Sequence, residues 1–341
     1  MIAAGAYPTA IAPLPSGRFP SGDAYMEDHH DLRIRATFDA ALGGRLIGID
    51  LLVLSRAWDE DLELFYYLKE VVRLGRGAAI PPLHLFDLLH GRGEANRDYG
   101  LARLRELVGR LAAATGAGIT ADALRAAIVE VNAQREATRR LLERRRLVPA
   151  GVTGVEALHL IGAGRFMRPV DHAALLNRHL DATEPIRHAG PRLLVVSATS
   201  LVHDRLHLAI EKAGAVVVAE DDSWGSRAAG RDVSAEGDRD QLLVGILDKY
   251  LLDVPSPRLA PAAARDEWLR TTVQSAGLDG VVFHVPATDH WFGWDYPRLR
   301  ALVEGAGLPS VVVRDDVHSA AGSDAVTESV AGFVHQGVGD R

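Results

Sequence analysis

Small polar and charged side chains follow four apolar segments in the C-terminal half of the chain. They are Ser197 to Ser200, Asp221 to Ser223, Ala287 to His290, and Asp315 to Asp316 with His318. If each apolar segment is a strand of one parallel sheet, these side chains meet at the carboxyl edge, where α/β proteins bind ligands. We therefore expect a shared site there, although loops are polar in most proteins and that alternative stays open.

These residue types could support acid–base or hydrolytic chemistry, with or without a metal ion. The candidate catalytic residues are Asp222, Ser223, Thr288, Asp289 and His290. Carboxylates at strand ends can bind a hard cation, but they cap the following helix equally often, so we assign no metal ligand. His203 and His207 have the spacing of two metal ligands on a helix, yet a solvated helix face is the favoured interpretation.

A second set of residues is expected to line a ligand cleft. These candidates are Arg35, Ser55, Ser197, Gly225, Ser226, Arg227, Trp291 and Asp316. Trp224, Trp291 and Trp294 come from two loops, and we weigh a flat ligand or a protein interface equally against packing in the core. No glycine-rich phosphate-binding motif follows the first strand of either half, which argues against a nucleotide held by such a loop.

The elements that must position these residues alternate between strand and helix. Apolar runs at 193–197, 215–220, 280–285 and 310–314 predict four parallel strands, with helices between them and a helix over 296–304. Nearer the N-terminus, a strand at 47–55 and a helix at 59–73 form a βα unit, and a weaker strand is expected at 80–89. The region between these parts is predicted to be entirely helical.

The fold class is therefore α/β, with two Rossmann- or flavodoxin-like doubly wound parallel-sheet domains and a helical segment between them. We expect an N-terminal α/β domain over 1–95, a helical bridging region over 96–188 and a C-terminal α/β domain over 189–341.

Composition excludes several classes of protein. The formal net charge is −7, and the one basic cluster, Arg139 to Arg146, is interpreted as a solvated helix face, so nucleic acid is not expected as a partner. No apolar run is long enough to span a membrane, and the first residues match a signal peptide poorly, so we expect a cytoplasmic protein. The absence of cysteine excludes disulfides, thiolate nucleophiles and cysteine-ligated clusters.

The order of several motifs resembles one known family. The segments are AAGAYP, LLVLSRAWDE, GAVVVAEDDSWGSR, KYLLDVPSPR, DGVVFHVPATDHWFGWDYPRLRALVEGAGLP and VVVRDD. Together they resemble the 2-hydroxyacyl-CoA dehydratase and benzoyl-CoA reductase subunits, including the D-component of 2-hydroxyglutaryl-CoA dehydratase. The resemblance implies two α/β domains with a helical part, subunits paired as pseudo-twofold dimers, and an iron–sulfur cluster held by cysteines between the domains. It also implies radical chemistry on an acyl-CoA, started by an ATP-dependent activator.

The sequence departs from this family at the cluster ligands. By the resemblance, the former cysteine positions are Trp58, Ser223 and Thr288, and less surely Asp31 and Ser256. A thiolate supplies the negative charge and soft sulfur that an iron–sulfur cluster requires, and neither a hydroxyl nor an indole can replace it. We therefore expect no cofactor bound by this chain, and an iron–sulfur cluster only in a partner subunit.

Three functional hypotheses follow. The favoured one is a clusterless subunit that supports acyl-CoA binding and pairs with a cysteine-bearing homologous subunit, as a heterodimer, with a self-dimer as the alternative. The second is an independent enzyme with a cluster-free site of Asp, His and Thr side chains, with or without a metal. The third is a non-catalytic protein that binds an acyl-CoA or another small molecule. None of them involves nucleic acid or a membrane.

Overall fold

The structure is a computed structural model. It describes residues 1–11, 18–27, 30–56, 59–77, 79–90, 93–182, 188–197, 204–221, 226–252, 262–275, 277–286, 289–314 and 323–338. By density of contacts the chain divides into two compact units. Unit 1 comprises Met1–Val129 and Asp232–Val254, and unit 2 comprises Glu130–Arg231 and Pro255–Arg341. The division into three regions at 95/96 and 188/189 follows changes of secondary structure, and it stays a prediction.

Unit 1 contains a short parallel sheet packed by helices. Its elements are η1 (Ile2–Ala4), α1 (Pro20–Tyr25), α2 (Leu32–Leu42), β1 (Leu52–Ser55), α3 (Asp59–Arg73), β2 (Leu83–Phe86), α4 (Glu94–Thr115) and α9 (Arg239–Leu252). Strands β1 and β2 pair in parallel, with Leu52 opposite Leu83. The helix α5 (Ala121–Arg146) contributes residues to both units, and the hydroxyl of Thr120 accepts a hydrogen bond from the Ala123 N–H, as expected of an N-cap.

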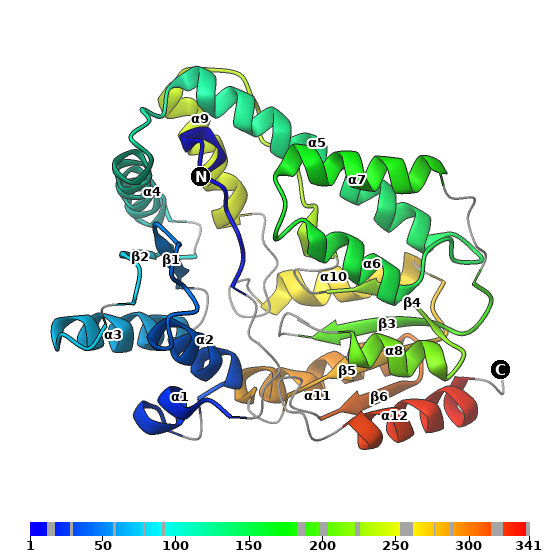
Figure 1. Cartoon of the computed structure of the whole chain (residues 1–341). Coiled ribbons are helices and arrows are strands. Elements are labelled where there is room, and N and C mark those ends of the chain that lie inside the picture. Colours follow the sequence, from blue (N-terminus) through cyan, green and yellow to red (C-terminus); the bar gives the residue numbers. More distant parts are fainter. Residues whose placement is uncertain are drawn as a thin grey trace. The chain divides into compact units, whose positions relative to one another are not determined.

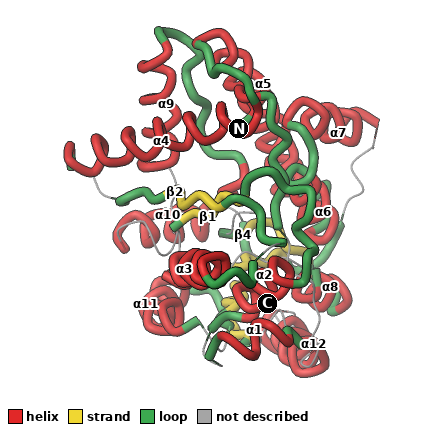
Figure 2. Tube along the Cα trace, turned by 60° about the vertical axis from the view of Figure 1, so that its left-hand side comes forward, coloured by secondary structure: helices red, strands yellow, loops and turns green. Residues whose placement is uncertain are grey.

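Unit 2 contains the larger sheet (Figure 1). Its remaining elements are α6 (Gly154–Ala163), α7 (Pro169–Ala182), β3 (Arg192–Ser197), α8 (Arg205–Lys212), β4 (Val216–Glu220), η2 (Ser226–Ala228), α10 (Ala262–Ser275), β5 (Gly280–His284), α11 (His290–Gly305), β6 (Ser310–Val313), α12 (Ser323–Gly332) and η3 (Phe333–Val338). The four strands are all parallel, in the order β4-β3-β5-β6. Figure 2 colours the helices red and the strands yellow along the same trace.

Alternating side chains of the larger sheet pack into two separate cores. Leu194, Val196 and Phe283 pack with apolar residues of α10 and α11, whereas Leu193 and Val195 pack with residues of α8 and α12. Because neighbouring residues of a strand point to opposite faces, this pattern requires helices on both sides of the sheet. Every residue of β3, β4 and β5 is buried. The prediction of a doubly wound α/β fold with a four-stranded parallel sheet is confirmed.

Several predicted boundaries were wrong, and the strand expected at 80–89 covers only Leu83–Phe86. The strand expected at 47–55 begins only at Leu52, because the chain turns at Gly48 with a φ of 95° and leaves Ile47 77% exposed. The helix expected at 296–304 begins at His290, so Pro297 lies inside it rather than in its first turn. No helix in the described ranges is both long enough and apolar enough to cross a membrane.

Candidate functional site

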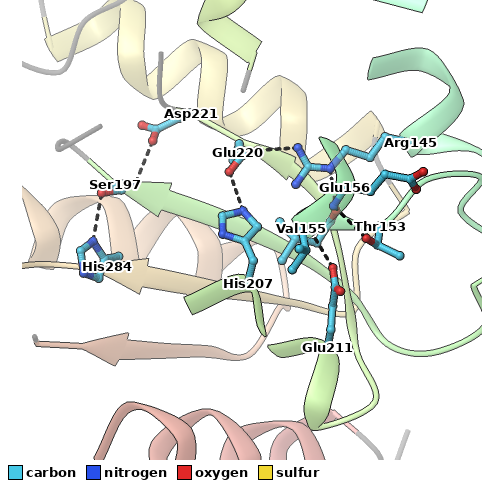
Figure 3. A network of polar contacts seen from close by, with 11 residues as sticks. Arg145, Thr153, Val155, Glu156, Ser197, His207, Glu211, Glu220, Asp221 and His284 are labelled. Atoms are coloured by element: carbon cyan, nitrogen blue, oxygen red, sulfur yellow. Dashed lines mark hydrogen bonds and ion pairs between the residues drawn. The ribbon is translucent and has the colours of Figure 1, made fainter. Parts of the chain in front are cut away.

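Three buried polar side chains join the carboxyl ends of adjacent strands in unit 2. The carboxylate of Asp221, directly after β4, accepts a hydrogen bond of 2.7 Å from the backbone N–H of Ser197 at the end of β3. The hydroxyl of Ser197 lies 3.2 Å from Nδ1 of His284, the last residue of β5 (Figure 3). All three residues are at most 5% exposed. We call Ser197, Asp221 and His284 the edge network.

The environment of Asp221 shifts the pKa of its carboxyl toward neutral pH. Burial, which disfavours the charged form, raises the pKa of Asp221 from its ordinary value to about 6. The positive charge of Arg227 and the hydrogen bond from the Ser197 N–H act in the opposite direction and are outweighed. A carboxyl with such a pKa at the carboxyl edge of a sheet is the kind of group that acid–base chemistry uses.

The preceding residue, Glu220, lies in a contrasting environment. Its carboxylate forms an ion pair with Arg145 from the last turn of α5, and it lies 2.8 Å from Nε2 of His207 in α8 (Figure 3). Arg145 and His207 are fully buried, and Glu220 is 2% exposed. Burial alone would raise the pKa of Glu220, but the charges of Arg145 and His207 outweigh it and lower this pKa to about 2. We call Arg145, His207 and Glu220 the buried triad.

The buried triad corrects two interpretations of the sequence. His207 was expected on a solvated helix face, but it is buried against Glu220, and His203 lies outside the described residues. The cluster Arg139 to Arg146 was also interpreted as a solvated face, yet Arg145 has no exposure, and its Nε donates a hydrogen bond to the Val217 carbonyl. Residue spacing shows which side chains share a helix face, but not what covers that face.

The described candidate residues of unit 2 occupy different kinds of positions. Asp289, a candidate catalytic residue, caps α11, because its carboxylate accepts a hydrogen bond of 3.0 Å from the Phe292 N–H. Arg227 lies in η2 and is partly exposed, and its charge acts on Asp221. Trp291 and Trp294 lie on α11, 67% and 86% exposed, so the alternative that they pack in the core is wrong for both.

In unit 1 the candidates have structural partners or face solvent. Arg35 forms an ion pair with Asp23, and the carboxylate of Asp31 caps α2 by accepting a hydrogen bond from the Arg33 N–H. Ser55 is exposed at the end of β1. The other predicted site residues lie outside the described residues: Trp58, Asp222, Ser223, Trp224, Gly225, Ser256, Thr288 and Asp316, with the side chains of Ser226 and His290.

Residue patterns could have identified part of the edge network. His284 ends the otherwise apolar strand GVVFH, and a polar residue in that position was a signal that the sequence interpretation missed. Arg265, which pairs with Asp295 and whose charge reaches Asp221, gave no comparable signal, because its partners lie on other elements. In the described ranges, no three His, Asp or Glu side chains are grouped so that they could hold a metal ion.

The fold and the edge network define a doubly wound α/β protein with a buried polar group at the carboxyl ends of its strands. The family model for the D-component of 2-hydroxyglutaryl-CoA dehydratase matches residues 1–334, and the chain belongs to that family. The Escherichia coli (strain K12) protein named "Putative dehydratase subunit YjiM" is 24% identical over 298 residues, which cover 84% of this chain and 73% of that protein. The family assignment made from the order of motifs is confirmed.

The iron–sulfur cluster that the family resemblance implies does not fit the donor groups of this chain. The sequence contains no cysteine, and the edge network offers only a hydroxyl, a carboxylate and an imidazole. Among the positions that the resemblance assigns to the former ligands, the structure describes Asp31, whose carboxylate caps α2. Clusters of this kind require thiolate ligands, with imidazole as a substitute at some irons, so this chain lacks a ligand set for one.

Proposed function

We propose that this chain is a clusterless subunit of a dehydratase complex of its family. In this role it supports acyl-CoA binding and pairs with a homologous subunit that carries the cysteines. The observation that carries the proposal is the match to the family over residues 1–334 in a chain without cysteine. The scaffold is kept, whereas the thiolate chemistry would have to come from another chain.

The packing of unit 2 supports this proposal, because the sheet does not depend on a cluster for its cohesion. Its strands bury apolar side chains on both faces, and the edge network supplies hydrogen bonds between three strand ends. A fold stabilised in this way can persist after the cluster ligands have been replaced. The polar edge is then available for binding rather than for holding iron.

Co-expression tests the pairing. The chain and a cysteine-bearing homologue of the same family are produced together, each with a different affinity tag, and purified in sequence through both tags. We expect a one-to-one complex that survives dilution to micromolar concentration. Failure to form such a complex, with both chains folded by circular dichroism, would contradict the proposed pairing.

A ligand assay separates the binding roles. We expect CoA thioesters to raise the Tm of the heterodimer more than free CoA or the free acid does, because a ligand that binds only the folded state stabilises it. Equal stabilisation of the isolated chain would favour the third hypothesis, a binding protein without a partner. No stabilisation of either form would contradict acyl-CoA binding.

The near-neutral pKa of Asp221 favours a second candidate function, an independent enzyme with a cluster-free acid–base site. One reaction it could perform is hydrolysis of an acyl-CoA thioester. Because the chain has no cysteine, the thiol released by that reaction can be measured with a thiol reagent without background from the protein. Turnover by the isolated chain that is lost in Asp221→Asn would support this function, and no turnover with any thioester tested would remove the hydrolytic version.

A further inference from the structure

The helix α11 has apolar residues on two opposite faces. Phe292, Tyr296, Leu299 and Val303 are at most 9% exposed and pack into the core of unit 2. On the other side, the residues Trp291, Trp294, Pro297 and Ala301 are all exposed. Surface helices normally carry polar residues on the face that points away from the core. We call Trp291, Trp294, Pro297 and Ala301 the tryptophan face.

The charged side chains interleaved with the tryptophan face on α11 are already paired within unit 2. Arg298 forms ion pairs with Asp266 of α10 and with Asp295, and the Asp295 carboxylate also pairs with Arg265. Arg300 pairs with Glu304 at 2.7 Å, one turn further along the same helix. These groups neutralise one another, so the face fits an apolar protein surface better than a polyanion or an anionic lipid headgroup.

The area of the tryptophan face is suitable for the centre of a subunit interface. A tryptophan buries roughly 150–250 Å² when it is covered, so the two rings together would contribute about 300 Å². A stable interface buries about 800 Å² on each partner, and tryptophan is among the residues that most often dominate its free energy. The two rings would therefore supply more than a third of one side and act as its anchors.

The face also adjoins the candidate site along the chain. The helix α11 is the next element after β5, whose last residue, His284, belongs to the edge network, and Asp289 caps the helix immediately before Trp291. A protein bound to the first two turns of α11 would therefore border the carboxyl edge of the sheet.

We infer that the tryptophan face is the docking surface for the cysteine-bearing homologous subunit. This inference rests on the proposed function, and it adds which surface of this chain the partner covers. The partner is expected to present an apolar surface without unpaired charge, into which the two indole rings insert.

The test compares three forms of the chain in the co-expression assay and in a titration of the purified subunits. They are the wild type, the double variant Trp291→Ala/Trp294→Ala, and Tyr66→Ala, a control that truncates a 56% exposed aromatic ring on α3. We expect the double variant to weaken the heterodimer by roughly thirtyfold or more, and the control by less than about threefold. Both rings are exposed, so the Tm of the double variant alone should stay close to that of the wild type.

The outcomes separate this inference from the proposed function. If the wild type forms no heterodimer, the proposed function fails. If the wild type forms one and the double variant forms it equally well, the docking surface is wrong while the proposed function stands. A double variant that loses only self-association would assign the face to a second copy of this chain. Acrylamide quenching of tryptophan fluorescence, compared between the wild type and the double variant, shows whether the two indoles are exposed in the free chain. If they are shielded from acrylamide there, the inference is overturned.

Discussion

At the scale of single residues, two adjacent carboxylates of this chain have opposite acid–base properties. Glu220 is kept ionised by Arg145 and His207, whereas Asp221 is buried with weaker compensation, and its pKa rises to about 6. The two side chains belong to successive residues at the end of β4, which point to opposite faces of a strand. One strand end thus provides both a permanently charged anchor and a group that titrates.

Replacement of Asp221 by asparagine should change the pH dependence of stability. The pKa of Asp221 is raised by folding, so its contribution to stability is complete below the unfolded value of 3.8 and is lost as the pH rises through about 6. The wild type should therefore lose about 2 kcal/mol relative to Asp221→Asn between pH 4 and 7. Urea unfolding of both proteins across this range measures the difference. If the free energies of unfolding of the two proteins differed by the same amount at every pH, the pKa of Asp221 would not be raised by folding.

Removal of the Glu220 charge should be strongly destabilising. In Glu220→Gln the buried guanidinium of Arg145 loses its counter-ion, and such a loss costs about 3–5 kcal/mol. The double variant Arg145→Met/Glu220→Gln should be more stable than Glu220→Gln, because no buried charge is then left unpaired. Chemical denaturation at pH 7 gives the free energy of unfolding of the wild type, the two single variants and the double variant. The control is Glu304→Gln, which removes a charge from the exposed pair with Arg300. If the stability lost by the double variant equalled the sum of the losses from the two single substitutions, Arg145 and Glu220 would not be energetically coupled.

The buried triad also shows where prediction from sequence stops at this scale. Arg145 and Glu220 are 75 residues apart, and only the packing of α5 beside β4 brings them together. A charge in a basic, amphipathic segment is usually solvated, so the sequence pattern favoured the wrong interpretation. That Ser197 and Asp221 lie together at the carboxyl edge could be predicted, because that inference required only the fold class and the end of each apolar run.

At the scale of elements, the contact of α6 with the sheet depends on a glycine. A Cβ atom at Gly154, the first residue of α6, would lie 2.8 Å from Cβ of Val217 and 2.9 Å from Cδ2 of His207. The neighbours are a packed strand and a residue of the buried triad, neither of which can move freely. The small residue therefore allows α6 to lie against both β4 and α8.

A matched pair of substitutions tests this close approach. Gly154→Ala should lower the Tm and cost about 1–3 kcal/mol, because the added methyl group overpacks the contact. Gly109→Ala in α4 should instead stabilise the protein by about 0.5–1 kcal/mol, because no described atom lies within 4 Å of its added Cβ and alanine favours a helix. Thermal unfolding of both variants gives the comparison. Stabilisation by Gly154→Ala would show that α6 can shift away.

Most elements could be predicted from the sequence, and the exceptions have physical causes. The helix α3 begins and ends where its apolar spacing and terminal residues placed it. The start of α11 was missed because proline is expected in the first turn of a helix rather than inside it. In the structure Asp289 caps the helix earlier, and Pro297, which has no N–H to donate, is accommodated inside it.

At the scale of the whole molecule, the chain combines the scaffold of its family with a sequence that has no cysteine. The doubly wound sheet was predictable from the alternation of apolar runs and helices. The detailed roles of the edge residues were not, because burial and partners decide whether a carboxylate is an anchor, a cap or a proton carrier. Residue type alone cannot separate Glu220, which is ion-paired, from Asp289, which caps a helix, or from Asp221, whose pKa is raised by burial.

Cluster reconstitution tests the loss of the thiolate ligands. The chain is incubated anaerobically with iron, sulfide and a reductant, beside a cysteine-bearing homologue treated in the same way. We expect the homologue to gain the visible absorption of an iron–sulfur cluster, and this chain to retain no stoichiometric iron or sulfide after gel filtration. Stoichiometric iron with sulfide in this chain would contradict the clusterless assignment.

The position of β4 in the sheet has a consequence for solubility during folding. It is the outermost strand on its side of the described sheet, and an open strand edge can pair with a second unfolded or partly folded chain. One of its carbonyl groups, that of Val217, accepts a hydrogen bond of 2.7 Å from Nε of Arg145 instead of from a strand. The arginine that compensates Glu220 therefore also occupies the outer side of the strand ladder, and it protects the sheet against growth by addition of another chain.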